Sequence, residues 1–121
     1  MQQKLLIFFC LFIIYIIYSA FVYTKGTEGL ISSPKAAEGK LVFQKYNCTA
    51  CHQLYGLGGF LGPELTTVMS TPGKGEAYAR AILKSGTQRM PDFQLSENEI
   101  DNLVAFLEYV DETAITYKNR K

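Results

Sequence analysis

The chain has 121 residues, with 12 Lys and Arg residues against 11 Asp and Glu residues and a formal net charge of +1. This length allows one domain of ordinary size. The balanced charge argues against a nucleic-acid partner, which requires a basic surface. The mean hydropathy of +0.05 hides a contrast, because the apolar residues are concentrated at the N-terminus.

The N-terminal segment has the length of a membrane-spanning helix. Residues 5–23 contain no charged residue. A span needs about 20 apolar residues, whereas the core of a cleaved signal peptide has about 7–15. We therefore expect residues 1–24 to be an uncleaved signal anchor that crosses the membrane once. Cys10 follows Phe9 rather than the small residue of a lipidation signal, so we interpret it as a small buried hydrophobe.

The composition divides the chain into four expected parts: an anchor at 1–24, a polar tether at 25–33, a domain at 34–112 and a loosely ordered tail at 113–121. Ser33 and Pro34 predict the start of a helix that runs to about Tyr46. Gly39 lies within this helix, where glycine costs about 1 kcal/mol relative to alanine. Its presence predicts that another backbone passes close to the helix.

The centre of the chain carries the sequence Cys48-Thr49-Ala50-Cys51-His52. Two cysteines separated by two residues and followed by histidine are the attachment signature of a c-type haem. Each thiol adds to one porphyrin vinyl group, and the adjacent imidazole becomes the proximal iron ligand. The motif therefore predicts one haem c, covalently attached through Cys48 and Cys51, with His52 on the iron. A zinc site needs about four N or S ligands, but the chain has one histidine.

The segment after the motif, residues 53–65, contains four glycines, which exclude a regular helix. Backbone without side chains suits a loop that wraps tightly against a flat macrocycle. Pro63 keeps its carbonyl, which is able to accept a hydrogen bond from the proximal imidazole. Such bonds fix the orientation of the ring and raise its basicity.

A second helix is predicted for residues 76–85, with Tyr78 and Ile82 facing inward, Ala79 and Leu83 as further inward candidates, and Gly86 ending it. The bases Lys74, Arg80, Lys84 and Arg89 face only Glu76 in residues 74–89, whereas residues 92–112 carry acids and no base. Such a split either orients a redox partner or belongs to solvated helix faces.

The last helix has the clearest signals in the chain. Ser96 and Glu99 form a capping box, which predicts a helix from there to about Val110. Apolar residues recur along it at the spacing of one helix face: Ile100, Leu103, Val104 and Leu107.

A second axial ligand of the iron must come from methionine, because His52 is the only histidine. Met90 precedes Pro91, which fixes the backbone next to the thioether, so we predict Met90 as the distal ligand. Met69 is the alternative, with packing as its simpler role. Should Met90 instead be a core residue, the iron would be five-coordinate. Iron held by His and Met has no open position for a substrate, so this haem is expected to carry electrons.

Five separate elements resemble class I cytochrome c: Gly39 with Phe43, the Cys48–His52 motif, Gly62-Pro63 with Leu65, Met90-Pro91, and Leu103 with Phe106. The resemblance covers residues 35–110. It implies an all-α class I cytochrome c domain, with three main helices around a covalent haem c, on a single N-terminal transmembrane helix. In that family the first and last helices cross at the glycine, Pro63 stands at the imidazole-supporting position and Met90 at the distal position.

Residues 48–68 are similar to the haem segment of the small monohaem cytochrome c component of nitric oxide reductase. This resemblance implies a non-catalytic electron-transfer subunit in the bacterial inner membrane, single-pass, with its haem domain in the periplasm. It further implies a soluble periplasmic electron donor and, as acceptor, a haem of a large integral membrane oxidoreductase subunit.

Two other functions remain open at this point. One is a free-standing membrane-tethered cytochrome that shuttles electrons between a quinol-oxidising complex and a terminal oxidase. The other is a haem sensor or peroxidase, which needs an open or displaceable position on the iron.

Overall fold

The computed structural model describes residues 2–27 and 33–114. The chain divides into two compact units, Met1–Ser32 and Ser33–Lys121. Most of the expected tether and most of the expected C-terminal tail lie outside the described residues, so these two expectations stay predictions.

The first unit contains one long helix, α1 (Gln2–Thr27). Its segment Gln2–Lys25 has 24 residues and a mean hydropathy of 2.8, so it is long and apolar enough to cross a membrane. At 1.5 Å per residue, this segment measures about 36 Å, against about 30 Å for the hydrocarbon core of a bilayer. The predicted apolar N-terminal helix is therefore confirmed. Cys10 is exposed on α1. The expectation that it is a small buried hydrophobe is therefore not met within this unit.

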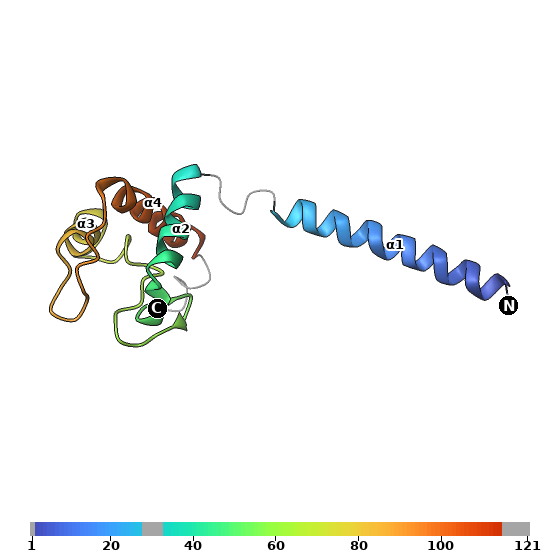
Figure 1. Ribbon diagram of the computed structural model, residues 1–121, viewed down its shortest axis with the longest axis horizontal. Helices are drawn as coiled ribbons and strands as arrows, with labels where there is room; N and C mark the ends of the chain where they lie inside the picture. The colour runs from blue at the N-terminus through green and yellow to red at the C-terminus, as the bar shows by residue number, and fades with distance from the viewer. Residues whose placement is uncertain (1, 28–32, 115–121) are drawn as a thin grey trace. The chain divides into compact units, whose positions relative to one another are not determined.

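Residues 33–114, the described part of the second unit, form three helices, one short 3-10 turn and one two-stranded hairpin. Figure 1 labels the helices α2, α3 and α4. Its elements are α2 (Pro34–Lys45), η1 (Cys48–Ala50), β1 (Gln53–Leu54), β2 (Leu57–Gly58), α3 (Glu76–Ser85) and α4 (Glu97–Thr113). The two strands are antiparallel, with Gln53 opposite Gly58 and Leu54 opposite Leu57. The predicted all-α class and its three main helices are confirmed. The hairpin was not expected, and it shapes the start of the glycine-rich loop.

The helices α2 and α4 cross at Gly39, as predicted (Figure 1). A Cβ atom on Gly39 would lie 1.9 Å from the carbonyl oxygen of Asn102 and 2.8 Å from Cβ of Phe106. Next to the crossing, the rings of Phe43 and Phe106 have centroids 5.4 Å apart. The core continues from these rings along both helices and comprises Val42, Phe43, Leu103, Phe106 and Val110. Glycine is therefore required where the two backbones touch.

The predicted caps are both present. Ser33 accepts a hydrogen bond from the Ala36 N–H at the start of α2. At the start of α4, the Glu99 N–H donates to Ser96 Oγ over 3.2 Å, and the Ser96 N–H donates to Glu99 Oε2 over 3.0 Å. These side chains satisfy N–H groups that have no partner within their own helix.

Glu99 also connects the end of α2 to the start of α4. Lys45 Nζ lies 2.8 Å from Glu99 Oε1, and the Tyr46 hydroxyl donates to the same oxygen over 3.2 Å. The Lys45 ammonium, with the Ser96 N–H and hydroxyl, lowers the pKa of Glu99 from 4.5 to about 2. One carboxylate therefore caps one helix and binds the last turn of another.

The bases and acids that are separated in the sequence form ion pairs between α3 and α4. Arg80 contacts Asp101 through Nη1 at 2.6 Å and Glu76 through Nε at 2.8 Å. Lys84 pairs with Glu97. The bases of α3 therefore meet the acids that begin α4, and the Arg80 guanidinium lowers the pKa of Asp101.

The predicted inward face of α3 is partly wrong. Tyr78 is 40% exposed, whereas its neighbour Ala79 is buried. Ile82 and Leu83 are half-buried. Ala79, Ile82 and Leu83 lie at the i, i+3 and i+4 spacing of one helix face, which is the inward face of α3, and Leu83 packs against the core.

The low pKa of Glu99 makes stability depend on acidity. Because the folded-state pKa of Glu99 lies below 4.5, the contribution of its carboxylate to the free energy of unfolding is complete above pH 4.5. This contribution is lost as the pH falls toward about 2. We expect the wild-type melting temperature to fall across this range more steeply than that of Glu99→Gln. Circular dichroism melts at a series of pH values measure this difference. Glu97→Gln, in the same helical turn, is the control, and equal slopes for wild type and Glu99→Gln would contradict the assignment.

Candidate haem site

The two cysteines of the motif lie on one tight turn. Asn47 adopts a left-handed conformation (φ 50°) after α2, and η1 follows at once. The His52 N–H donates to the Cys48 carbonyl over 2.9 Å, and the Cys51 N–H donates to the same oxygen over 3.2 Å. Residues three apart in such a turn lie on the same side. Cys48 and Cys51 therefore present two thiols to one side of the chain.

Both thiols are free and half-buried. Burial raises the pKa of the Cys48 thiol, and the neighbouring Cys51 adds to the shift. The two groups are therefore held near each other in a partly apolar environment without a disulfide between them. This arrangement suits attachment to an apolar ring.

The imidazole of His52 is oriented by a backbone carbonyl. His52 Nδ1 lies 2.8 Å from the Pro63 oxygen. Because a carbonyl oxygen only accepts, the proton must be on Nδ1, which leaves the Nε2 lone pair for a metal. The structure therefore brings together Cys48, Cys51, His52 and Pro63, four of the five predicted site residues.

The glycines of the loop pack against the attachment motif itself. A Cβ atom on Gly62 would lie 2.4 Å from Cε1 of His52. A Cβ atom on Gly58 would lie 2.2 Å from the His52 carbonyl oxygen, and one on Gly59 would lie 2.0 Å from the Ala50 carbonyl oxygen. The structure thus gives these glycines a reason of its own, and the expected contact with a macrocycle stays a prediction. They allow the loop to fold closely over the protein's own haem-attachment turn.

Backbone hydrogen bonds hold the loop in this position. The Gly59 N–H donates to the Thr49 carbonyl and the Gly62 N–H to the Cys51 carbonyl, each over 2.8 Å. At the base of the loop, the Leu65 N–H donates a hydrogen bond to the Gln53 carbonyl over 2.9 Å. The carbonyl that orients His52 is therefore part of a closed, hydrogen-bonded loop.

Tyr55 and Thr66 were missed by sequence reasoning, although they fasten this loop to the rest of the domain. Tyr55 has φ 53° and donates its N–H to the Oγ1 of Thr66, which is fully buried. The Tyr55 hydroxyl donates to the Val110 carbonyl over 3.2 Å and lies 2.8 Å from Thr113 Oγ1. No local pattern in the sequence marks either residue, because their partners lie far along the chain.

Met90, the fifth predicted residue, lies half-buried in the loop after α3. The Thr87 N–H donates to the Met90 carbonyl over 2.8 Å, and the Met90 N–H donates to Thr87 Oγ1 over 3.0 Å. These bonds close a tight turn around Met90. Within residues 33–114 no hydrogen bond joins Met90 to the attachment motif.

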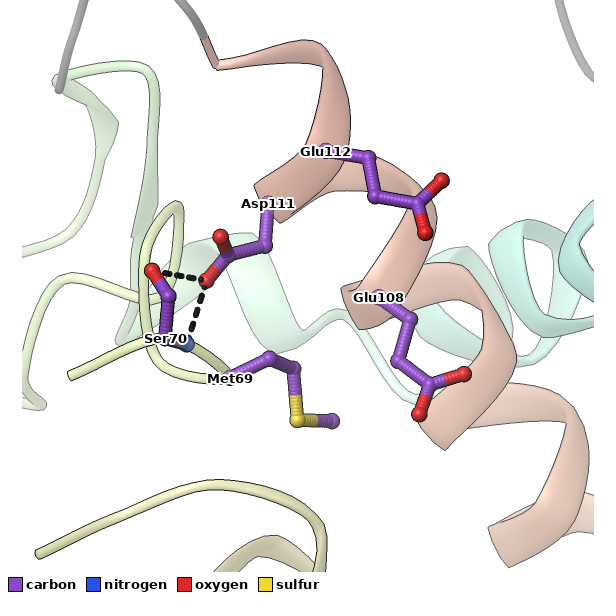
Figure 2. A pocket seen from close by; sticks show the side chains of 5 residues that line it. All are labelled: Met69, Ser70, Glu108, Asp111 and Glu112. Atoms are coloured by element: carbon purple, nitrogen blue, oxygen red, sulfur yellow. Dashed lines mark hydrogen bonds between the residues drawn. The ribbon is translucent and has the colours of Figure 1, made fainter. Parts of the chain in front are cut away.

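Met69, the alternative ligand, lines a pocket beside the C-terminal half of α4. Figure 2 shows its thioether in this pocket, together with the carboxylates of Glu108 and Glu112. At the edge of the pocket, the buried Asp111 accepts hydrogen bonds from the N–H and hydroxyl of Ser70, over 2.8 and 3.0 Å. The surroundings of Met69 are therefore largely anionic.

The residues of the attachment turn fit a haem c. Two free thiols lie on one side of a turn, and an imidazole with its Nδ1 proton fixed follows directly. In the part of the chain that the structure describes, no group of three or more His, Cys, Asp and Glu side chains is arranged to hold a metal ion. The donor set therefore matches a haem iron better than a zinc ion.

Residues 34–107 match the family model described as cytochrome C oxidase, cbb3-type, subunit III. The chain belongs to this cytochrome c family. The match begins at the first residue of α2 and ends within α4, so it takes in both crossing helices and the attachment turn between them.

Among curated proteins, the cytochrome is similar to the C subunit of nitric oxide reductase from three bacteria. It is 34% identical to that of Stutzerimonas stutzeri, over 59% of this chain and 55% of the relative. It is 32% identical to that of Halomonas halodenitrificans, over 69% of this chain and 63% of the relative. It is 30% identical to that of Paracoccus denitrificans, over 69% of this chain and 64% of the relative. The chain thus spans less than two thirds of the length of these relatives.

The contact between Gly62 and His52 gives a test of the site. We expect Gly62→Ala to displace the imidazole, to weaken its bond to Pro63, and to lower the free energy of unfolding by about 1–3 kcal/mol. Denaturant unfolding measures the stability, and the imidazole nitrogen resonances report the bond. Gly56→Ala is the control, because Gly56 has φ +78° but no atom within 4 Å of its Cβ position. A change of the His52 resonances in both variants would contradict the assigned contact.

Proposed function

We propose that this membrane-anchored cytochrome c passes electrons as the small subunit of a nitric oxide reductase-like complex. Its donor is a soluble periplasmic protein, and its acceptor is a haem of a large integral membrane subunit, which carries the reaction. When bound, the haem supplies reversible one-electron transfer at its iron. The observation that carries the proposal is the 2.8 Å contact between His52 Nδ1 and the Pro63 carbonyl, directly after two free thiols.

Each site residue has a distinct role in this proposal. Cys48 and Cys51 would hold the haem through two thioether bonds, and His52 Nε2 would bind its iron. The Pro63 carbonyl holds the Nδ1 proton and so keeps the imidazole in one orientation. Met90 provides the distal thioether, which its closed turn presents at low entropic cost. The anionic pocket around Met69 supports the choice of Met90.

The proposed location follows from the anchor and the cofactor. Helix α1 is long and apolar enough to cross a membrane. Covalent attachment of haem c takes place outside the bacterial cytoplasm, so the haem domain belongs on the periplasmic side of the inner membrane. The likeness to the C subunit of nitric oxide reductase supports a permanent membrane partner over a freely shuttling cytochrome.

The distal ligand is tested by Met90→Ala. Loss of the thioether removes the ligand that stabilises reduced iron, so we expect the reduction potential to fall by on the order of 0.1 V, within the ~0.8 V that axial ligands control. The sulfur-to-iron charge-transfer band of the oxidised protein should vanish, and carbon monoxide should bind the reduced form. Met69→Ala is the matched control and should leave all three unchanged. If Met69→Ala produces these changes instead, the ligand is Met69.

The partnership is tested with the full chain, tagged at its C-terminus and purified from its native membranes in mild detergent. We expect a second, haem-containing integral membrane subunit in stoichiometric amount, and nitric oxide consumption when a reduced periplasmic donor is added. His52→Ala should abolish that consumption. Purification of the cytochrome without a second haem protein would favour the free-standing shuttle, and ligand binding to the wild-type iron would favour a sensor or peroxidase.

A further inference from the structure

Three apolar side chains project from the glycine-rich loop into solvent. Leu57, Phe60 and Leu61 are 76%, 87% and 78% exposed, more than any other large hydrophobic residue described in the second unit. We call these three residues the apolar loop surface. Single exposed hydrophobic residues are ordinary, but three within five positions form a patch that marks an interaction site.

Glycines flank these three side chains in the loop. Gly58, Gly59 and Gly62 face the attachment turn, because any Cβ atom there would overlap Ala50 or His52. Phe60 and Leu61, between Gly59 and Gly62, and Leu57, directly before Gly58, are instead open to solvent, as their exposed fractions show. The apolar loop surface thus lies on the outer side of the same loop whose inner side covers the proximal histidine.

This surface is preorganised. The loop is held to the attachment turn by the N–H groups of Gly59 and Gly62, each bonded over 2.8 Å to a carbonyl of the turn. Tyr55 adds bonds to the C-terminal end of α4. Binding through side chains on such a loop costs little ordering entropy, which favours a defined protein partner.

Charge indicates the chemistry of that partner. Residues 53–63 contain no charged side chain, whereas the bases of α3 are engaged with the acids of α4. An uncharged surface is complementary to an uncharged one, because a charged partner surface would lose its hydration against these residues without compensation. The partner face is therefore apolar.

The short connection between α1 and the haem domain limits how far from the membrane the partner lies. Five residues separate the end of α1 from Ser33, and whatever their conformation they span at most about 18 Å. A partner of an anchored domain on so short a connection is itself at the membrane. Helix α2, 12 residues and about 18 Å long, separates Ser33 from the attachment turn.

We propose that Leu57, Phe60 and Leu61 dock this cytochrome onto an uncharged apolar face of the integral membrane protein that accepts its electrons. The inference rests on the proposed function and adds the surface through which that function works. Docking there places the acceptor against the loop that covers the proximal histidine.

The occupant is identified by photocrosslinking in the full-length, haem-loaded cytochrome in its native membranes. Phe60 is replaced by p-benzoylphenylalanine, and Leu41, which is 57% exposed on α2, is replaced in the same way as the control. We expect an adduct with a haem-containing integral membrane subunit at position 60 and none at position 41. Adducts only with lipid, only with a second copy of the chain, or with no molecule would overturn the proposal.

The energetic role is tested with the combined Leu57→Ser, Phe60→Ser and Leu61→Ser variant, and with Leu41→Ser as its control. We expect electron delivery to the co-purified subunit to slow by at least about tenfold in the triple variant only. Its absorption spectrum and reduction potential should match those of the wild type, and raising the salt concentration should affect both proteins alike. A shifted potential would mean that these residues cover the haem, and the docking proposal would fail.

The two proposals fail differently. A wild-type cytochrome that purifies without a haem-containing membrane subunit overturns the proposed function and this docking surface together. A wild type that delivers electrons to such a subunit, beside a triple variant that does so at the same rate, overturns the docking surface alone.

Discussion

The imidazole of His52 is held between two features of one loop, the Gly62 backbone and the Pro63 carbonyl. The rest of the domain depends on this contact in a simple way. The carbonyl is useful only if it stays where it is, because a hydrogen bond weakens steeply with distance and angle. Each part of the second unit that touches the loop therefore contributes to the orientation of one ring.

The frame that supplies this rigidity is the crossing of α2 and α4. The crossing brings the last turn of α2 to the first turn of α4, where Lys45 meets Glu99. At the opposite end of α4, the Tyr55 hydroxyl forms hydrogen bonds with the Val110 carbonyl and Thr113 Oγ1. The attachment turn follows α2 directly, and the loop is tied to α4. The one contact at Gly39 thus sets both halves of the site relative to each other.

Local signals in the sequence predicted most of the frame. The Ser96–Glu99 capping box and the apolar spacing of α4 involve residues close together in the sequence. The close approach at Gly39 is also visible locally, because glycine is unfavourable within a helix. The partners of Tyr55 lie about 55 residues away, and no local pattern encodes such a bond. Tyr78 was placed wrongly because Ala79, Ile82 and Leu83 already complete one apolar face of α3, and the spacing within so short a helix does not decide on which side of that face a neighbouring tyrosine lies.

The loop from Leu57 to Gly62 serves two purposes with two sets of residues, glycines toward the attachment turn and apolar side chains exposed to solvent. Sequence change on the outer side is therefore free to alter what the domain recognises while the electronic surroundings of the histidine stay constant. A lineage can in this way exchange one membrane partner for another without having to re-evolve its redox centre.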